Sequence, residues 1–409
     1  MPNKERNIPK RRFKAFENAD AWELRKLGEV APLRGGFAFK SSDFVKEGIP
    51  IVRISNILSN GHVGAEFVHY KELEQDERFT LHDGAAVLAM SGATTGKVSV
   101  LHVDEGEKYY QNQRVGYFTP TPEYNYDFIK VIVNSTFFTT QLSSVLVAGA
   151  QPNISSKEVD DFCFAFPKSL PEQEAIGTFF STLDRHITLH QRKLDKLKSV
   201  KQAYLSEMFP AEGERVPKRR FPGFTDDWEL RKLGEVAEMY SGGTPSVGKK
   251  EFYEGNIPFI RSAEINSHNT ELFLSELGLS NSSAKMVNKG DLLYALYGAT
   301  SGEVGLAKIS GAINQAILAI IPSIDYSSNF LLQWLKREKN NIIEKYLQGG
   351  QGNLSGAIVK DFSIMFPSLP EQEAIGTFFS TLDRHITLHQ RKLEKLKNLK
   401  KALLNELFV

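Results

Sequence analysis

One stretch of sequence occurs twice in this chain, about 200 positions apart and without a single difference. The first copy, Leu170–Leu194, reads LPEQEAIGTFFSTLDRHITLHQRKL, and the second copy is Leu369–Leu393. A long element repeated in this way gives the molecule two similar halves. A pseudo-symmetric molecule suits a partner that is itself nearly two-fold symmetric, and double-stranded DNA is the commonest such partner.

The duplication includes a leading segment before each half. Pro9–Phe13 (PKRRF) and Trp22–Ala31 (WELRKLGEVA) return as Pro217–Phe221 and Trp228–Ala237. The chain therefore reads leading segment, domain and helix, and then the same three blocks again. We expect four parts: an N-terminal leading segment with a first domain (1–168), a central repeat helix (169–210), a second leading segment with a second domain (211–367), and a C-terminal repeat helix (368–409).

Between these shared blocks the two domains keep only sparse landmarks, in the same order. They pair Gly35-Gly36 with Gly242-Gly243, Ile49–Arg53 with Ile257–Arg261, Gly92–Gly96 with Gly298–Gly302, Asn112-Gln113 with Asn314-Gln315, and Gln151, Asn153, Asp161 and Phe162 with Gln351, Asn353, Asp361 and Phe362. Short apolar runs before glycine turns predict buried strands, and Tyr126–Ser144 and Ser327–Tyr346 predict helices. The simplest account is two mixed α/β domains of one fold with different surfaces.

The repeated stretch predicts a long helix with one apolar seam and a capping box (Ser-Leu-Pro-Glu) at its start. The seam residues fall at alternating spacings of four and three, which is the heptad pattern of a coiled coil. In the first copy they are Ile176, Phe180, Leu183, Ile187, His190, Leu194 and Leu197, continued by Lys201, Tyr204 and Met208. In the second they are Ile375, Phe379, Leu382, Ile386, His389, Leu393 and Leu396, continued by Lys400, Leu403 and Leu407.

A helix of this kind would expose its seam, so it needs a partner, and the other copy is available. The same joints attach each helix to its flanking domains, so a two-fold relation between the halves makes the pair antiparallel. We therefore predict an α+β protein: two similar mixed α/β domains separated by a long antiparallel two-helix coiled coil, with a pseudo-two-fold, circular organisation. In this arrangement His190 and His389 should lie close together.

Composition excludes several classes of protein. A chain of 409 residues with 41% hydrophobic and 24% charged residues fits two globular domains. The single cysteine, Cys163, cannot form an internal disulfide framework or a zinc knuckle. The N-terminus lacks the apolar run of a secretion signal, and no segment approaches the roughly 18 apolar residues of a membrane span. We expect a soluble cytoplasmic protein.

The net charge of +1 is low for a protein that grips phosphate unaided. Residues 32–165 hold about 11 basic side chains against about 16 acidic ones. If the chain reads DNA, a basic partner subunit must supply most of the phosphate neutralisation.

Two motifs on the predicted helices could bind a ligand, but a structural role explains each of them more simply. His186 and His190 are spaced to chelate a metal, but the Glu of the metalloprotease pattern is missing and His190 lies in the seam. We favour a polar seam position that fixes register. The lysine-rich stretches Gln191–Lys198 and Gln390–Lys397 could touch nucleic acid, and we favour a solvated coiled-coil face, part of which docks another subunit.

The loop Gly92–Lys97 (GATTGK) differs from a phosphate-binding loop because only three residues separate its glycines and Val98 follows its lysine. In the matching loop Glu303 replaces Lys97 and would repel phosphate. We interpret both loops as tight structural turns that can present backbone groups and hydroxyls to a ligand.

Catalytic motifs are missing from both halves. There is no Asn-Pro-Pro-aromatic tetrapeptide, no glycine-rich cofactor loop in the right context, and no paired nuclease set. The best-matched polar residues of the two domains are Gln, Asn, Arg, Thr and Ser, which hydrogen-bond base edges and backbones. The chain therefore looks like a protein that recognises a DNA sequence and not like one that modifies or cuts DNA.

The repeated LPEQEAIG…LDRHITLHQRKL, the Glu207–Pro210 sequence EMFP, and the RFPGF and WELRKLGEV segments of Arg220–Phe224 and Trp228–Val236 resemble the specificity subunits (HsdS) of type I restriction-modification systems. The resemblance covers essentially the whole chain. It implies two target-recognition domains that each read one half of a split target, with no catalytic residue and no metal on this chain. Two methyltransferase (M) subunits would bring S-adenosylmethionine, and motor-nuclease (R) subunits would bring ATP and Mg²⁺. The paired helices would set the gap between the half-sites.

Candidate DNA-binding residues are polar side chains at or near the landmarks. In the first domain they are Arg34, Lys40, Arg53, Thr94, Thr95, Lys97, Gln113, Arg114, Gln151 and Asn153. In the second domain they are Thr244, Ser246, Arg261, Tyr297, Thr300, Ser301, Asn314, Gln315, Gln351 and Asn353. A structural hydrogen bond is the alternative for each, above all for Arg53, Arg261 and the paired Asn-Gln and Gln-x-Asn positions.

Two rival functions remain distinguishable. A self-contained DNA methyltransferase or nuclease predicts activity from the purified chain alone. A coiled-coil scaffold or protein-binding adaptor predicts no sequence-dependent protection of DNA even after partners are added.

Overall fold

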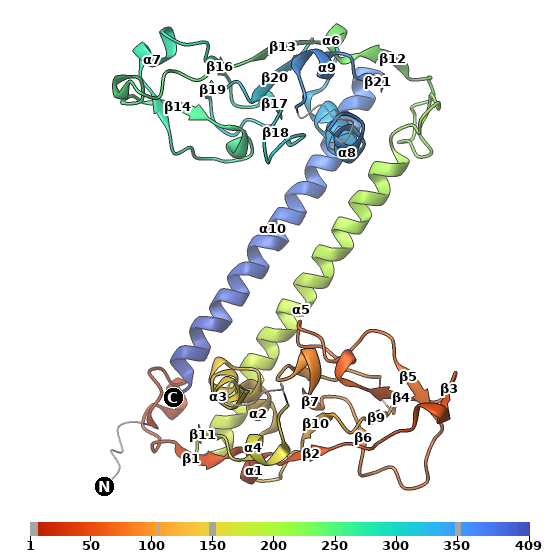
Figure 1. The fold of residues 1–409 in the computed structure, drawn as a ribbon, viewed down its shortest axis with the longest axis vertical. Helices are drawn as coiled ribbons and strands as arrows, with labels where there is room; N and C mark the ends of the chain where they lie inside the picture. The colour runs from red at the N-terminus through yellow and green to blue at the C-terminus, as the bar shows by residue number, and fades with distance from the viewer. Residues whose placement is uncertain (1–6, 105, 147–152, 348–352) are drawn as a thin grey trace. The chain divides into compact units, whose positions relative to one another are not determined.

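The computed structural model describes residues 7–104, 106–146, 153–347 and 353–409 and contains two compact units (Figure 1). One unit consists of Met1–His190 with Lys392–Val409, and the other of Gln191–Arg391. Each unit therefore holds one mixed α/β domain, the first part of one long helix and the last part of the other.

The first domain is built from short strands, short helices and single helical turns. Its elements are η2 (Lys14–Phe16), β1 (Glu23–Lys26), α1 (Leu27–Val30), β2 (Leu33–Gly35), η3 (Ser41–Asp43), β3 (Phe44–Val45), β4 (Ile49–Val52), η4 (Ile54–Asn56), β5 (Val68–Tyr70), β6 (Thr80–Leu81), β7 (Ala86–Ala89), η5 (Gly92–Thr94), β8 (Val98–Val100), β9 (Tyr109–Gln111), β10 (Val115–Phe118), α2 (Tyr126–Val133), α3 (Thr136–Leu146), α4 (Ser156–Asp160) and β11 (Cys163–Phe166). The long helix α5 (Leu170–Glu207) follows.

The second domain repeats this order with local changes. Its elements are β12 (Glu229–Lys232), α6 (Leu233–Val236), β13 (Ala237–Ser241), η6 (Lys250–Phe252), β14 (Ile257–Ile260), η7 (Ser262–Glu264), β15 (Phe273–Leu274), α7 (Glu276–Ser280), β16 (Lys285–Val287), β17 (Leu292–Ala295), β18 (Val304–Leu306), β19 (Gly311–Ile313), β20 (Ile317–Pro322), α8 (Ser328–Leu347), α9 (Gly356–Lys360) and β21 (Ser363–Phe366). The long helix α10 (Leu369–Leu407) follows. The predicted helices correspond to α2 with α3 and to α8.

The sheets of the two domains have matching orders. A four-stranded sheet runs β2-β10-β7-β8 in the first domain and β13-β20-β17-β18 in the second. A second sheet runs β3-β5-β4-β9-β6 in the first domain and β15-β14-β19-β16 in the second. Within each second sheet one pair is parallel, β4 with β9 and β14 with β19. This agreement identifies the two domains as copies of one fold.

The strand registers correct one landmark. The N–H of Phe37 donates to the Gln111 carbonyl at 2.9 Å, and the N–H of Gly243 donates to the matching Ile313 carbonyl at 3.2 Å. Gly36 is therefore equivalent to Gly242, one position away from the pairing that the sequence suggested. A Cβ on Gly242 would lie 1.8 Å from the Ile313 carbonyl oxygen, so only glycine fits this crossing.

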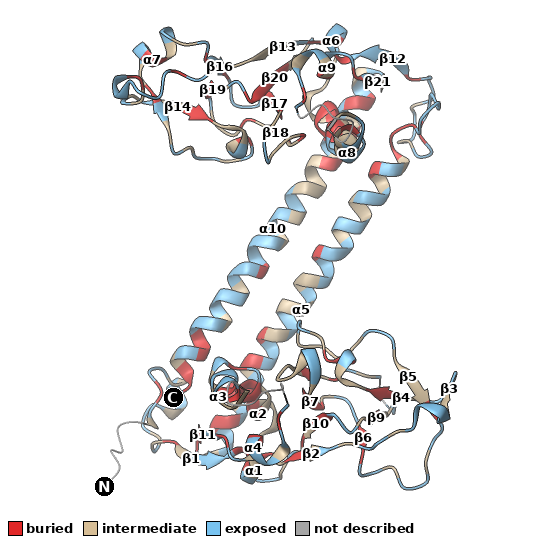
Figure 2. Cartoon of the chain, viewed as in Figure 1, coloured by how far each residue is buried: buried red, intermediate tan, exposed pale blue. Residues whose placement is uncertain are grey.

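The buried core of each domain includes residues of both long helices, and buried residues are seen near the ends of these helices in Figure 2. In the first unit Phe408, just beyond α10, stacks on Phe128 of α2 with ring centroids 5.3 Å apart and also meets Phe180 of α5. In the second unit Phe209, just beyond α5, packs on Phe330 at 5.2 Å and on Phe379 of α10 at 6.3 Å. The start of each long helix thus lies against the end of the other, so α5 and α10 run antiparallel. The predicted fold class is confirmed.

Reciprocal ion pairs join the two helices. In the first unit Lys400 Nζ lies 2.6 Å from Asp184 Oδ1, and in the second unit Lys201 Nζ lies 2.6 Å from Asp383 Oδ1. Burial lowers the pKa of Lys201, although Asp383 opposes this shift. Burial raises the pKa of Asp383, but the positive charges of Lys336 and Lys201 outweigh burial, so the pKa of Asp383 is lowered. The lysines that interrupt the predicted seam are therefore matched by aspartates on the facing helix.

The predicted capping boxes are wrong, because both glutamates bind the leading segments. The buried carboxylate of Glu172 accepts hydrogen bonds from Arg12 Nε and Nη2 at 2.8 Å and from Trp22 Nε1 at 3.3 Å. Glu371 accepts the same pair of bonds from Arg220, at 2.9 and 2.7 Å. A two-pronged Arg–carboxylate pair fixes direction as well as distance, so it clamps each leading segment to the start of a long helix.

The leading segments also meet the helix ends alike. The N–H of Arg11 donates to the Glu406 carbonyl at 2.9 Å in the first unit. The N–H of Arg219 donates to the Glu207 carbonyl at 2.9 Å in the second. Glu207 and Arg219 are close in sequence, whereas Glu406 and Arg11 are about 400 positions apart.

Candidate functional site

Most polar candidates of the first domain gather where the parallel strands β4 and β9 end. The carboxyl ends of parallel strands lie at one edge of a sheet, so the residues that follow them are neighbours. Arg53 follows β4, and Gln113 and Arg114 lie just beyond β9. The N–H of Asn112 donates to the Val52 carbonyl at 3.1 Å and ties the two strand ends together.

The loop Gly92–Lys97 lies against this edge. Thr94 Oγ1 donates to the Ile54 carbonyl at 3.1 Å, and Thr95 Oγ1 donates to the Gly92 carbonyl at 2.6 Å. Gly92 and Gly96 adopt φ angles of 79° and 86°, which favour glycine. The loop is therefore a structural turn, as predicted, and its threonine hydroxyls are engaged within the protein.

Met90 links the remaining residues of the edge. Its N–H donates to the Arg114 carbonyl at 3.0 Å, and its carbonyl accepts from the N–H of Ile154 at 2.9 Å. This places Arg114 and the exposed Asn153 beside the turn. Lys97 points away to Ser59, which accepts its hydrogen bond at 2.8 Å.

Three candidates of the first domain remain. Arg34 meets the end of β9, where its Nε donates to Gln111 Oε1 at 3.3 Å. Arg34, in β2, donates to the Thr80 carbonyl at 2.8 Å and lies 4.7 Å above the Tyr117 ring, and burial lowers its pKa. Lys40 is exposed beside η3. Gln151, like Gln351 in the second domain, belongs to the residues that the structure does not describe. These contacts hold Arg34 within its domain, and a role for it in DNA binding stays a prediction.

The second domain forms the corresponding edge from β14 and β19. The N–H of Asn314 donates to the Ile260 carbonyl at 3.4 Å, and Thr244 hydrogen-bonds Gln315. Ser301 donates to the Leu296 carbonyl at 3.1 Å. The remaining candidates of this domain have exposed or half-exposed side chains: Ser246, Tyr297, Thr300 and Asn353.

The two matched arginines differ in their surroundings. Arg261 Nη2 lies 2.8 Å from Glu264 and 2.6 Å from Glu271, and these hydrogen bonds raise its pKa. Arg53 has Asn56 where Arg261 has Glu264. Within the described residues Arg53 Nε is buried without a hydrogen-bond partner. Arg261 is therefore neutralised by its own domain, whereas no acidic side chain of the described part of the chain pairs with Arg53.

The Glu264 carboxylate is held in its charged form. Burial opposes ionisation, but hydrogen bonds from the Arg261 side chain and from backbone N–H groups outweigh it and lower the pKa of Glu264 to about 2. Glu264 also accepts from Thr270 Oγ1 at 3.2 Å. No sequence landmark indicated this acidic partner, although its position three residues after Arg261 was a usable signal.

The predicted seam residues are buried or half-buried. The buried ones are Ile176, Phe180, Leu183, Leu194, Ile375, Phe379 and Leu393, and the half-buried ones are Ile187, His190, Leu197, Leu382, Ile386, His389 and Leu396. The proximity of His190 and His389 stays a prediction. Sequence reasoning missed Asp184 and Asp383, which the identical repeat places one residue after a seam leucine.

Within the described residues no cluster of three or more His, Cys, Asp or Glu side chains is arranged to hold a metal ion. Across the same part of the chain, none of the helices is both long and apolar enough to cross a membrane.

Fold and site together define a duplicated protein that presents two unlike polar edges and joins its halves through antiparallel helices. Residues 19–199 and 225–398 match the family described as type I restriction modification DNA specificity domain. The chain belongs to this family. It is a specificity subunit of type I restriction enzymes and not one of their catalytic subunits.

Individual relatives agree with this assignment. The chain is 28% identical over 191 residues to the MjaIX specificity subunit of Methanocaldococcus jannaschii, a match covering 45% of this chain and 44% of that protein. It spans about half the length of the first curated relatives it matches. It is 22% identical over 409 residues to the putative MjaX specificity subunit of the same organism, covering 95% and 93% of the two chains.

The fold is also similar to a crystal structure of the S subunit of a type I restriction-modification system from M. genitalium. The TM-score is 0.70 with 16% identity, and 98% of this chain and 99% of that chain are covered.

Proposed function

We propose that the chain reads a bipartite DNA target, with one half-site for each domain and a fixed gap between them. The observation that carries this proposal is the pair of matched edges at β4/β9 and β14/β19, which share their strand order but differ in their side chains. Polar residues at one sheet edge can hydrogen-bond base edges in the major groove. Different residues at the two edges favour different half-sites.

Partner subunits carry the chemistry in this proposal. Two methyltransferase subunits dock largely on the helices, bind S-adenosylmethionine and methylate an adenine flipped out of each half-site. Motor-nuclease subunits use ATP and Mg²⁺ to translocate and cleave DNA. The low net charge of +1 supports this division, because the partners then supply the phosphate contacts. The assembled complex works in the cytoplasm.

Mapping of methylated bases tests the proposal. Genomic DNA is sequenced from cells that hold the methyltransferase subunits with and without this chain. We expect one bipartite motif that disappears with the chain. Protein binding without any sequence-dependent methylation or protection would favour the scaffold alternative, and methylation by the purified chain alone would favour a self-contained enzyme.

A change in helix length tests the spacing role. Helices of 38 and 39 residues at about 1.5 Å per residue are roughly 57 Å long, which corresponds to roughly 17 base pairs at about 3.4 Å each. One added heptad in each helix adds about 10 Å. We expect the gap to lengthen by about three base pairs while both half-sites stay the same; an unchanged gap would refute the spacing role.

A circular permutant tests the organisation of the halves. The matching contacts of Arg11 with Glu406 and of Arg219 with Glu207 support a chain that could be opened at either place. A permutant that joins 409 to 1 and opens near residue 212 is expected to assemble and methylate. Loss of assembly with intact helix content would count against this symmetry.

A further inference from the structure

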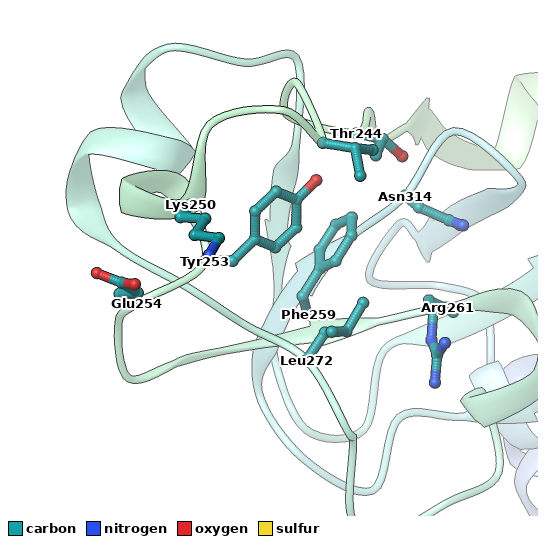
Figure 3. A pocket seen from close by; sticks show the side chains of 9 residues that line it. Thr244, Lys250, Tyr253, Glu254, Phe259, Arg261, Leu272 and Asn314 are labelled. Carbon is teal, nitrogen blue, oxygen red and sulfur yellow. The ribbon is translucent and has the colours of Figure 1, made fainter.

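The second domain contains a cavity of about 490 Å³ beside its polar edge (Figure 3). Its walls are apolar: Phe259 from β14, Leu272 and Tyr253, with the Tyr253 and Phe259 rings 6.5 Å apart. Thr244 and Asn314 lie at its rim, together with Arg261. The cavity is therefore continuous with the residues that we propose to read the second half-site.

The first domain fills the matching face with aromatic rings. Register pairs Ile51 with Tyr110 in the first domain and Phe259 with Ala312 in the second, so Ala312 stands where Tyr110 stands. Phe39 stacks on Tyr110 with centroids 5.6 Å apart. In the second domain Gly243 replaces Phe37, and Pro245 lies two residues further on, where Phe39 lies in the first. The second domain thus lacks the rings that cover this face in the first.

The size and charge of the cavity restrict its ligand. Pockets of roughly 300–1,000 Å³ hold a whole small molecule, so this one is larger than a methyl group needs. Its lining includes Lys250, Arg261 and Glu254, and Arg261 already binds Glu264 and Glu271. A rim without surplus positive charge disfavours a free polyphosphate. It suits a neutral ring whose phosphate is bound elsewhere.

We propose that this cavity takes one unpaired nucleobase of the second half-site. The ring enters between Tyr253 and Leu272, beside Phe259, and its polar edge meets the Asn314 amide and the Thr244 hydroxyl. A base inside the stack exposes only its edges, so a base that enters a pocket must first leave the helix. The inference rests on the proposed DNA-reading function and adds to it a second mode of recognition that the first domain does not share.

Abasic duplexes test the inference, with the chain assembled with its methyltransferase subunits. In duplexes of the mapped target, one base of the second half-site is removed at a time. Where a base enters the cavity, removal of the base opposite to it leaves it unpaired and eases its extrusion. We expect about tenfold tighter binding at that position and weaker binding when the entering base itself is removed.

A variant that blocks the cavity assigns the effect. Val247 lines the cavity and is 80% exposed, so Val247→Trp fills the space without disturbing the core. We expect this variant to lose the tenfold gain. The control is Ile324→Trp in the same domain, where Ile324 is 91% exposed and outside the cavity; it should keep the gain.

Two outcomes overturn the inference. One is the absence of a gain at every position other than that of the methylated adenine, whose extrusion into the partner's pocket gives a gain of its own. The other is a gain at a second position that survives Val247→Trp. Failure of the proposed function looks different, because the wild-type complex then shows no preference for the mapped duplex over a scrambled one.

Discussion

The two domains share a strand order, yet the side chains at the matching sheet edge differ in packing and in charge. In the first domain aromatic rings cover the face beside β4, and Arg53 has Asn56 beside it and no acidic partner among the described residues. In the second domain the face holds a cavity, and two glutamates neutralise Arg261. One scaffold can therefore carry two recognition chemistries, because the differences lie in loops and side chains beyond the strand ends.

The largest expected effect concerns the two ion pairs that hold the leading segments, Arg12 with Glu172 and Arg220 with Glu371. Arg12→Met should lower the free energy of unfolding by about 3–4 kcal/mol, because it leaves the buried Glu172 carboxylate without its cation. Arg220→Met should cost less, because Arg220 is 15% exposed against 5% for Arg12. Hydrogen exchange resolved by unit measures both, and the exposed neighbour Arg11→Met is the control. Equal losses in the two units would contradict the comparison.

The matched arginines should separate stability from binding. Arg261→Gln leaves Glu264 without its main donor and should destabilise the second unit by about 2 kcal/mol. Arg53→Gln should change stability by no more than about 0.5 kcal/mol but weaken binding of the assembled complex to its target about tenfold, if Arg53 contacts a base. Unfolding curves and equilibrium binding give both numbers. A large loss of stability in Arg53→Gln would show that its role is structural.

Acid should affect the second domain more than the first at this position. The folded pKa of Glu264 is about 2, below its ordinary 4.5, so its stabilisation is fully present above about pH 4.5 and is lost as the pH falls towards 2. We expect about 1.5 kcal/mol over this window, after allowance for solvent screening. Glu264→Gln should flatten the dependence, whereas the first domain already has the neutral Asn56 there. A profile unchanged by Glu264→Gln would contradict the assignment.

The smallest effect compares the helix pairs. Asp383 is more buried than Asp184 and also receives Lys336. Asp383→Asn should therefore cost about 1 kcal/mol and Asp184→Asn only a few tenths, as for an exposed pair. Thermal unfolding of both variants, with the exposed Asp195→Asn as control, checks this order. The reverse order would mean that burial does not set the strength of these pairs.

The sequence predicts the architecture well because the duplication and the heptad spacing can be recognised directly from the order of the residues. The Leu170–Leu194 repeat indicated two halves and an antiparallel helix pair. Side-chain partners were harder, since Glu172 binds Arg12 from about 160 positions away rather than capping its own helix. The glycine landmarks were paired one position out because the loops beyond β2 and β13 differ. The pairing of Arg261 with Glu264 and Glu271 was also missed, although Glu264 lies only three residues further along the chain.

The swapped helix ends affect the order in which the protein can be made. Residues 392–409 complete the core around Phe128 and Phe180, yet the ribosome adds them about 200 residues after the domain that they close. The second unit has all of its parts once residue 391 has emerged. The half that is translated first is therefore expected to be the last to reach its native packing.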